Sequence, residues 1–209
     1  MGKLVLQKCI VGSVFTNCYF LKNKETGEML IIDPGDNAEK IEQKILEMQG
    51  KPVAILLTHG HFDHATGAGE LAQLLHIKIY AQEKEKETLE NPQLNLSGWQ
   101  GSELVFYADE YLKDEQEIDL AGFHIRVFLT PGHTVGGCCY YFPYQNTLFS
   151  GDSLFQTSIG RTDFPKGSAS QLIHAIREKL MPLPDETAVY TGHGDMTTIG
   201  TERMYNPYL

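Results

Sequence analysis

Short apolar runs alternate along the chain with helical patterns, and this alternation predicts an α/β fold. Apolar segments at Lys3–Val11, Cys18–Leu21 and Met29–Ile32 predict three opening strands joined as a β-meander. A turn at Asp33-Pro34-Gly35-Asp36 ends this meander. Later strands are expected at Val53–Leu57, Ile77–Ala81, Cys138–Phe142, Thr147–Phe149 and Thr187–Tyr190, with a hairpin over Glu117–Leu129.

Three segments carry the spacing of amphipathic helices. The first places Ile41, Ile45 and Met48 on one face, with Asp36 or Asn37 as its cap and Gly50 as its end. The second is marked by Leu71, Leu74 and Leu75. The third begins with a capping box, Ser168 and Gln171, and turns Leu172, Ile173, Ile176 and Leu180 inward. Residues 83–102 are polar and indistinct, and we interpret them as a helix and loop that could form a lid or a substrate-facing insertion.

The segment from Thr58 to Ala68 contains the most informative chemistry. Positions 59–64 hold His59, His61, Asp63 and His64, directly after the predicted strand Val53–Leu57. Residues two apart in an extended segment point the same way, so His59 and His61 can converge on one point. Imidazole and carboxylate together suit zinc, iron or manganese. The pattern therefore predicts a metal site, rather than histidines that merely fill core or surface.

Four predicted strands are each followed by a side chain of a type that can bind a metal. After His59, the pattern recurs at His133, Asp152 and His193, each of which lies among small residues. Backbone that approaches a metal closely requires such small residues. We therefore expect one composite site. The remaining histidines, His76, His124 and His174, lack this context, and the helical pattern around His174 favours a solvent-facing position.

Composition excludes several classes of protein. The 209 residues carry a net charge of −10, which argues against a nucleic-acid partner. No run approaches the roughly 20 apolar residues of a membrane helix, and Lys8 interrupts the amino-terminal pattern of a signal peptide. We therefore expect a single domain over residues 1–209, a cytoplasmic location, and no membrane partner. Nothing in the pattern specifies an oligomeric state.

The four cysteines, Cys9, Cys18, Cys138 and Cys139, are too few and too irregularly spaced for a disulfide scaffold. Cys138 and Cys139 lie in an apolar strand pattern. We expect them to be buried thiols rather than redox groups.

The order of these motifs resembles the metallo-β-lactamase superfamily. The match runs from His59-x-His61-x-Asp63-His64 through His133 and Asp152 to His193. The resemblance implies an αββα sandwich, which is two mixed sheets face to face with helices outside and metals at one edge. More narrowly, Gly151–Phe155, Gly160–Phe164 and Thr191–Gly194 resemble the glyoxalase II, or hydroxyacylglutathione hydrolase, branch.

The resemblance implies a role for each candidate ligand. It implies that His59, His61 and His133 hold one metal, that Asp63, His64 and His193 hold a second, and that Asp152 bridges them. Asp63 is also expected to be a catalytic residue. The implied cofactors are two divalent ions, with zinc expected and iron or manganese as alternatives. Such ions can share a hydroxide, because a metal lowers the pKa of a bound water to about 7, so no serine or cysteine nucleophile is needed. Ser153 is then expected to support the site rather than attack.

The implied activity is hydrolysis of a small thioester such as S-lactoylglutathione by a metal-bridging hydroxide. Glyoxalase II continues into a helical domain that binds glutathione, whereas 16 residues follow His193 here. We therefore expect a short, glyoxalase II-like type. Arg161, Lys166 and Arg203 are candidates for a substrate carboxylate, but paired structural roles are favoured, and Asp163 is a suitable partner for Arg161.

Other functions remain open at this point. A persulfide dioxygenase of the same superfamily shares the Gly-Arg-Thr-Asp-Phe stretch and holds one iron with two histidines and one aspartate. Lactonases, β-lactamases and a non-catalytic binding module are further alternatives. The segment Thr191–Gly194 favours the hydrolase branch.

Overall fold

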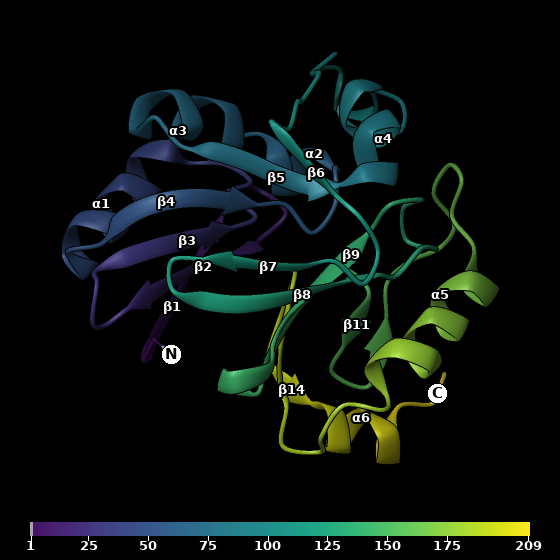
Figure 1. Cartoon of the computed structure of the whole chain (residues 1–209). Helices are drawn as coiled ribbons and strands as arrows, with labels where there is room; N and C mark the ends of the chain where they lie inside the picture. Colours follow the sequence, from purple (N-terminus) through teal and green to yellow (C-terminus); the bar gives the residue numbers. More distant parts are fainter. Residues whose placement is uncertain (1) are drawn as a thin grey trace.

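Two mixed β-sheets packed face to face, with helices on both outer sides, form the computed structural model of residues 2–209 (Figure 1). The first sheet has six strands in the order β1-β2-β3-β4-β5-β6. Their bounds are β1 (Leu4–Val11), β2 (Thr16–Asn23), β3 (Glu28–Ile32), β4 (Lys51–Leu56), β5 (Lys78–Gln82) and β6 (Glu110–Leu112). The opening three strands are antiparallel neighbours, which confirms the predicted meander.

The second sheet has the order β14-β13-β10-β9-β8-β7. Its strands are β7 (Glu117–Leu120), β8 (Phe123–Leu129), β9 (Cys138–Phe142), β10 (Thr147–Gly151), β13 (Ala188–Thr191) and β14 (Thr197–Thr198). The strands β7 and β8 form the predicted hairpin. A separate two-stranded sheet pairs β11 (Leu154–Phe155) with β12 (Ser158–Ile159).

The helices lie outside the two sheets. The α-helices are α1 (Ala38–Met48), α2 (Phe62–Ala65), α3 (Ala68–Leu75), α4 (Lys86–Glu90), α5 (Ala169–Ala175) and α6 (Ile199–Tyr205). Short 3-10 helices are η1 (Glu83–Glu85), η2 (Gly98–Gln100) and η3 (Pro143–Gln145), and the π-helix η4 (Ile176–Leu180) continues α5. In Figure 1, α1 and α3 lie beside the first sheet, and α5 and α6 lie at the opposite end beside the second.

Alternating side chains of single strands build three hydrophobic layers. In β3, Leu30 and Ile32 face the second sheet, while Met29 and Ile31 face the cluster that contains the helical residue Ile41. In β9 the alternation is the same: Tyr140 points between the sheets and its neighbours point to the layer under α5 and η4. Strands buried on both faces explain the continuous apolar runs of the sequence. The predicted αββα sandwich is confirmed.

Some local predictions need correction. Leu74 is 52% exposed rather than packed inward, whereas Leu71 on the same helix is fully buried. Asn37 stands at the start of α1, but its side chain does not cap the helix and instead accepts a hydrogen bond from the Gly12 amide. At the other end α1 stops before Gly50, as predicted, and Gln49 takes the left-handed conformation of the C-cap. A Cβ at Gly50 would lie 2.1 Å from Met29 Cε, so glycine fits there.

Strand direction brings the loops of the candidate residues to one edge. In the first sheet β4 runs parallel to β3 and β5. In the second sheet β10 is parallel to β13, and β8 has the same direction because both β8 and β10 are antiparallel to β9. The segments that follow β4, β8, β10 and β13 therefore start at the carboxyl ends of strands, as the recurring sequence pattern predicted.

Within residues 2–209, none of the helices has the length and apolar character needed to cross a bilayer.

Two of the three leucines of α3, Leu71 and Leu74, provide a matched test of the packing. Leu71→Ala should destabilise the protein by about 2–5 kcal/mol, because it leaves a cavity in the layer outside the first sheet. Leu74→Ala should change stability by less than about 1 kcal/mol, because half of that side chain is already in water. Urea denaturation of both variants, with metal removed, measures the difference. Equal losses would contradict the assignment of the buried face.

Candidate metal centre

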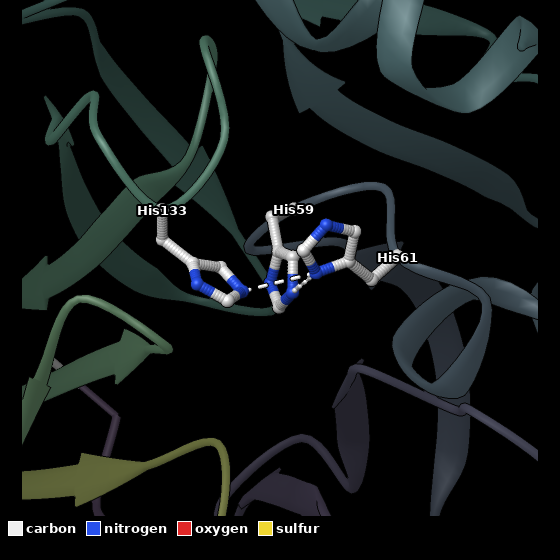
Figure 2. Close-up of side chains that lie close together, drawn as sticks. All are labelled: His59, His61 and His133. Carbon is white, nitrogen blue, oxygen red and sulfur yellow. Dashed lines mark hydrogen bonds between the residues drawn. The ribbon is translucent and has the colours of Figure 1, made fainter. Parts of the chain in front are cut away.

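Three histidines from two loops converge on one point. His59 and His61 follow β4, and the His59 Nε2 atom lies 3.1 Å from His61 Nδ1. His133 comes from the loop after β8, and its Nε2 atom lies 3.0 Å from the same His61 nitrogen. Figure 2 shows the three rings turned toward one another. The two-residue spacing correctly predicted that His59 and His61 converge.

A second group lies beside the first. Asp63 and His64 belong to the short helix α2, and His193 follows β13. The His193 Nε2 atom lies 3.3 Å from both His64 Nε2 and Asp63 Oδ2. One ligand-type atom from each of these residues lies within 4.8 Å of the others, as is also true of the three histidines above. The structure therefore brings six predicted ligands into two sets of three.

Asp152 lies between the two sets. Its Oδ1 atom is 3.5 Å from His64 Nε2, and its Oδ2 atom is 3.4 Å from His133 Nε2 and 3.5 Å from His193 Nε2. The Oδ1 atom is buried and has no hydrogen-bond partner within residues 2–209. A Cβ at Gly192 would lie only 2.0 Å from this oxygen, so glycine is required there. Asp152 thus faces ligand-type atoms of both sets.

The charge state of these residues fits a cation site. Burial lowers the pKa values of His59, His61 and His133, so these imidazoles are neutral and offer lone pairs. Burial also opposes a charge on His64, but the carboxylates of Asp63, Asp152 and Asp33 outweigh it and raise its pKa to about 10. A proton on His64 thus balances the carboxylates, and a divalent ion bound there would displace it. The donor set of imidazole nitrogens and carboxylate oxygens suits zinc, iron or manganese.

Asp33 holds His64 in place, and sequence reasoning treated it only as a turn residue. Its Oδ2 atom is 3.0 Å from His64 Nδ1 and accepts a hydrogen bond of 2.6 Å from the Thr58 hydroxyl. Its Oδ1 atom accepts from the Thr58 amide at 2.8 Å. The Nδ1 atom is thereby engaged, so Nε2 is the nitrogen free to bind a metal. The signal was available, because Asp33 follows β3 directly and β3 runs parallel to β4.

Residues of β2 in the first sheet donate hydrogen bonds to Asp63 and to the loop that carries His193. The Thr16 hydroxyl donates to Asp63 Oδ2 at 2.9 Å. Asn17 donates through Nδ2 to the carbonyls of Thr191 and Gly194, and the Tyr19 hydroxyl donates to Thr191 at 2.6 Å. The contacts of Asn17 and Tyr19 hold the His193 loop against β2. No local pattern in the sequence marks these three residues.

Other predicted residues lie outside the ligand set. Ser153 is buried and its hydroxyl pairs with Thr130 Oγ1 at 2.6 Å, which suits a supporting residue and not a nucleophile. All four cysteines are free and buried, and burial raises the pKa values of the Cys138 and Cys139 thiols, as expected for inert groups. His174 is exposed and lies 3.3 Å from Glu178, so its predicted solvent-facing position is confirmed.

A cleft of about 520 Å³ opens over the two sets of ligands. His61, Asp63, His133, Asp152 and His193 form its floor. Its walls include the apolar side chains Leu96, Trp99, Phe155, Ile159 and Phe164. Leu96, Trp99 and Gln100 come from the segment 83–102, which therefore faces the space above the ligands.

The three candidate cations for a substrate carboxylate are already paired, and one of them, Arg161, lines the cleft. Arg161 makes two hydrogen bonds to the Asp163 carboxylate, at 3.0 and 2.7 Å, and lies 4.4 Å from the centre of the Phe164 ring. Lys166 pairs with Glu87 at 2.5 Å. Arg203 pairs with Asp185 and with two backbone carbonyls. The favoured structural pairing of these three residues is confirmed.

Comparison with known proteins identifies relatives over nearly the whole chain. The model of the metallo-β-lactamase superfamily matches residues 11–193. The chain is 40% identical to the probable metallo-hydrolase YqgX of Bacillus subtilis, covering 95% of this chain and 94% of that protein. It is also 40% identical to the hydroxyacylglutathione hydrolase GloC of Haemophilus influenzae, with 92% of each covered.

Two solved structures are similar at the level of the backbone. The crystal structure of the BLEG-1 B3 metallo-β-lactamase superposes with a TM-score of 0.93 and 40% identity, over 98% of this chain and 99% of that one. The crystal structure of TTHA1623 in a di-iron-bound form has a TM-score of 0.84 and 33% identity, over 97% of this chain and all of that one.

Asp152 and His174 provide a test of the ligand assignment. Asp152→Ala should lose bound metal and most turnover, because it removes the carboxylate that faces both sets of ligands. His174→Ala should leave both nearly unchanged, because that ring is exposed on α5. Metal content by elemental analysis and turnover under identical conditions measure both. Comparable losses in the two variants would mean that the ligand set is misassigned.

Proposed function

Since the chain belongs to the metallo-β-lactamase superfamily, we propose that this metallo-hydrolase cleaves small thioesters such as S-lactoylglutathione at a two-metal centre. The position of Asp152 carries the proposal, because its two oxygens face both sets of ligands. A complete second set favours two ions over one. We further infer that residues 1–209 act as one domain, because ligands from both sheets contribute to a single centre.

Two divalent ions would supply a hydroxide nucleophile near neutral pH and polarise the carbonyl of the substrate. We propose zinc as the metal, since neutral histidines dominate the first set. Iron is the main alternative metal, and the similar protein TTHA1623, solved in a di-iron-bound form, supports that alternative.

Residues of the chain would then supply the catalytic carboxylate and bind the substrate. Asp63 borders the cleft and is held by Thr16, and we propose it as both a ligand and the catalytic carboxylate. Burial opposes ionisation of Asp63, but His64 and His193 outweigh this effect and keep its pKa well below its usual range. The apolar walls, with Trp99 and Phe164, would hold the substrate and exclude water.

The nature of the cleft supports a thioester whose thiol part is not strongly bound. A thiolate leaves readily, so the reaction asks little of a general acid. Arg161 is the single Lys or Arg side chain among the described residues that line the cleft, and Asp163 already pairs with it. A substrate carboxylate would have to displace that pair. Glutathione is therefore proposed as an accepted thiol and not as a required one.

A β-lactam is the second candidate substrate. The similarity of 40% to the BLEG-1 B3 metallo-β-lactamase over 98% of this chain favours it. A lactonase would use the same centre. A mononuclear-iron persulfide dioxygenase is less favoured, since it would leave the set of Asp63, His64 and His193 without a role.

Metal stoichiometry tests the two-metal centre. Fully active protein should hold two ions per chain, because seven candidate ligands exceed what one tetrahedral or octahedral ion takes from protein. Elemental analysis of protein purified without added metal, followed by titration with zinc, measures occupancy against activity. Saturation of activity at one ion per chain would refute the two-metal centre.

A substrate panel tests the specificity. The ratio kcat/KM for the lactoyl thioester of glutathione should exceed that of a truncated thiol by far less than a thousandfold, or about 4 kcal/mol. The reason is that Arg161, the one cation among the described residues that line the cleft, is already paired with Asp163. Steady-state hydrolysis of both esters by zinc-loaded and iron-loaded enzyme measures this ratio. A larger preference would reveal a glutathione site. Absent thioesterase activity with efficient β-lactam hydrolysis would replace the proposed function by the second candidate.

A further inference from the structure

Glu85 is a fully buried carboxylate that connects the two loops of the first ligand set. It belongs to η1, directly after β5, and is 1% exposed. Its Oε1 atom accepts a hydrogen bond from the Gly60 amide at 2.8 Å. Its Oε2 atom accepts from the Gly136 amide at 2.7 Å and from the Thr134 hydroxyl at 2.9 Å. Two of the three donors are backbone amides, which cannot accept, so the geometry suits an ionised carboxylate.

The donors to Glu85 are neighbours of the ligands in the chain. Gly60 lies between His59 and His61, and Thr134 follows His133. The contact is close, because a Cβ at Gly136 would lie 2.2 Å from the Glu85 nitrogen. One carboxylate thus fixes the separation of two loops that come from different sheets.

Glu85 is hydrogen-bonded, but its charge has no opposite charge paired with it in the part of the chain that the structure describes. Among residues 2–209 it makes no ion pair, although a buried carboxylate without a nearby cation is costly. Histidines bind metals as neutral imidazoles, so the first set contributes no negative charge of its own. Among the proposed ligands of this site, Asp152 is the one that carries a negative charge, and it faces the second set as well.

We propose that Glu85 is a positioning residue for the metal site of His59, His61 and His133. Its hydrogen bonds set the distance between the two loops, and its negative charge stabilises the ion that they hold. The inference rests on the proposed two-metal centre and deepens it. It states that the metal affinity of the three-histidine site depends on Glu85 more than that of the site of Asp63, His64 and His193.

Single-site backgrounds separate the two sites experimentally. His193→Ala leaves the three-histidine site, and His61→Ala leaves the site of Asp63, His64 and His193. In the His193→Ala background, Glu85→Gln should weaken zinc binding by about tenfold to a hundredfold, the range seen for groups that orient metal ligands. In the His61→Ala background the change should be below about threefold. Competition with a chromophoric chelator measures both dissociation constants on the metal-free full chain.

Glu202 is the matched control for a merely structural role. It is also fully buried, and it accepts hydrogen bonds from the Thr157 amide, the Thr197 hydroxyl and Asn206 Nδ2. Glu202→Gln should lower thermal stability but leave zinc affinity at the three-histidine site within about threefold. An equal loss of affinity in both glutamate variants, or in both backgrounds, would overturn the proposal.

A milder variant covers the case in which Glu85→Gln does not fold. Thr134→Val removes one donor to Glu85 and should weaken zinc binding severalfold at the three-histidine site alone. Unchanged affinity in this variant would also count against Glu85. If the His193→Ala protein with its native Glu85 binds no zinc, the two-metal centre itself fails, and this inference falls with it.

Discussion

The burial of a dense cluster of imidazoles and carboxylates is the constraint on which the rest of the structure depends. His59, His61 and His133 are forced to be neutral by desolvation, whereas His64 is held charged by the carboxylates around it. Such a cluster is unfavourable unless cations enter it or hydrogen bonds satisfy every oxygen. The surrounding elements therefore place hydrogen-bonding groups around the cluster. At its centre, the nitrogen and oxygen atoms that could bind a metal face one another.

The architecture supplies these groups through strand ends and tight backbone contacts. Strands that run in the same direction within a sheet end at the same edge, so the ligands that follow them lie close together without long loops. Glycines make the close approach possible. A Cβ at Gly35 would lie 1.5 Å from the Asp63 carbonyl oxygen, and one at Gly160 would lie 1.8 Å from that of Asp152. Glycine at these two positions is thus a steric requirement of the ligand backbone.

Sequence patterns predicted what local periodicity encodes, and they failed where a contact depends on a distant partner. The longer strands, the three long helices and the spacing of His59 and His61 were predictable because each is determined by neighbouring positions. The short strands β6, β11, β12 and β14 were not predicted. The helix α2 has four residues, too few to show a period. Asn17 and Glu85 carry no local signal, since the groups that they bind lie far along the chain.

Leu74 shows the same limit within a helix. Its spacing from Leu71 is correct for an inward face, yet the helix presents that position to water. Which part of an apolar stripe is covered depends on the sheet beneath it, and single-sequence periodicity does not describe the sheet. The same reasoning applies to β11, β12 and β14, which are two residues long and exist only because a partner segment lies beside them.

The support of the His193 loop by β2 ties the centre to the order of folding. Asn17 and Thr191 are separated by 174 positions, and their hydrogen bond joins nearly the first strand to nearly the last. Contacts of such sequence separation form late, because the chain must first lose the entropy of closing a very long loop. During synthesis the first ligands therefore emerge well before the loop that completes the centre. The complete set of candidate ligands comes together only when β2 and the His193 loop are in contact.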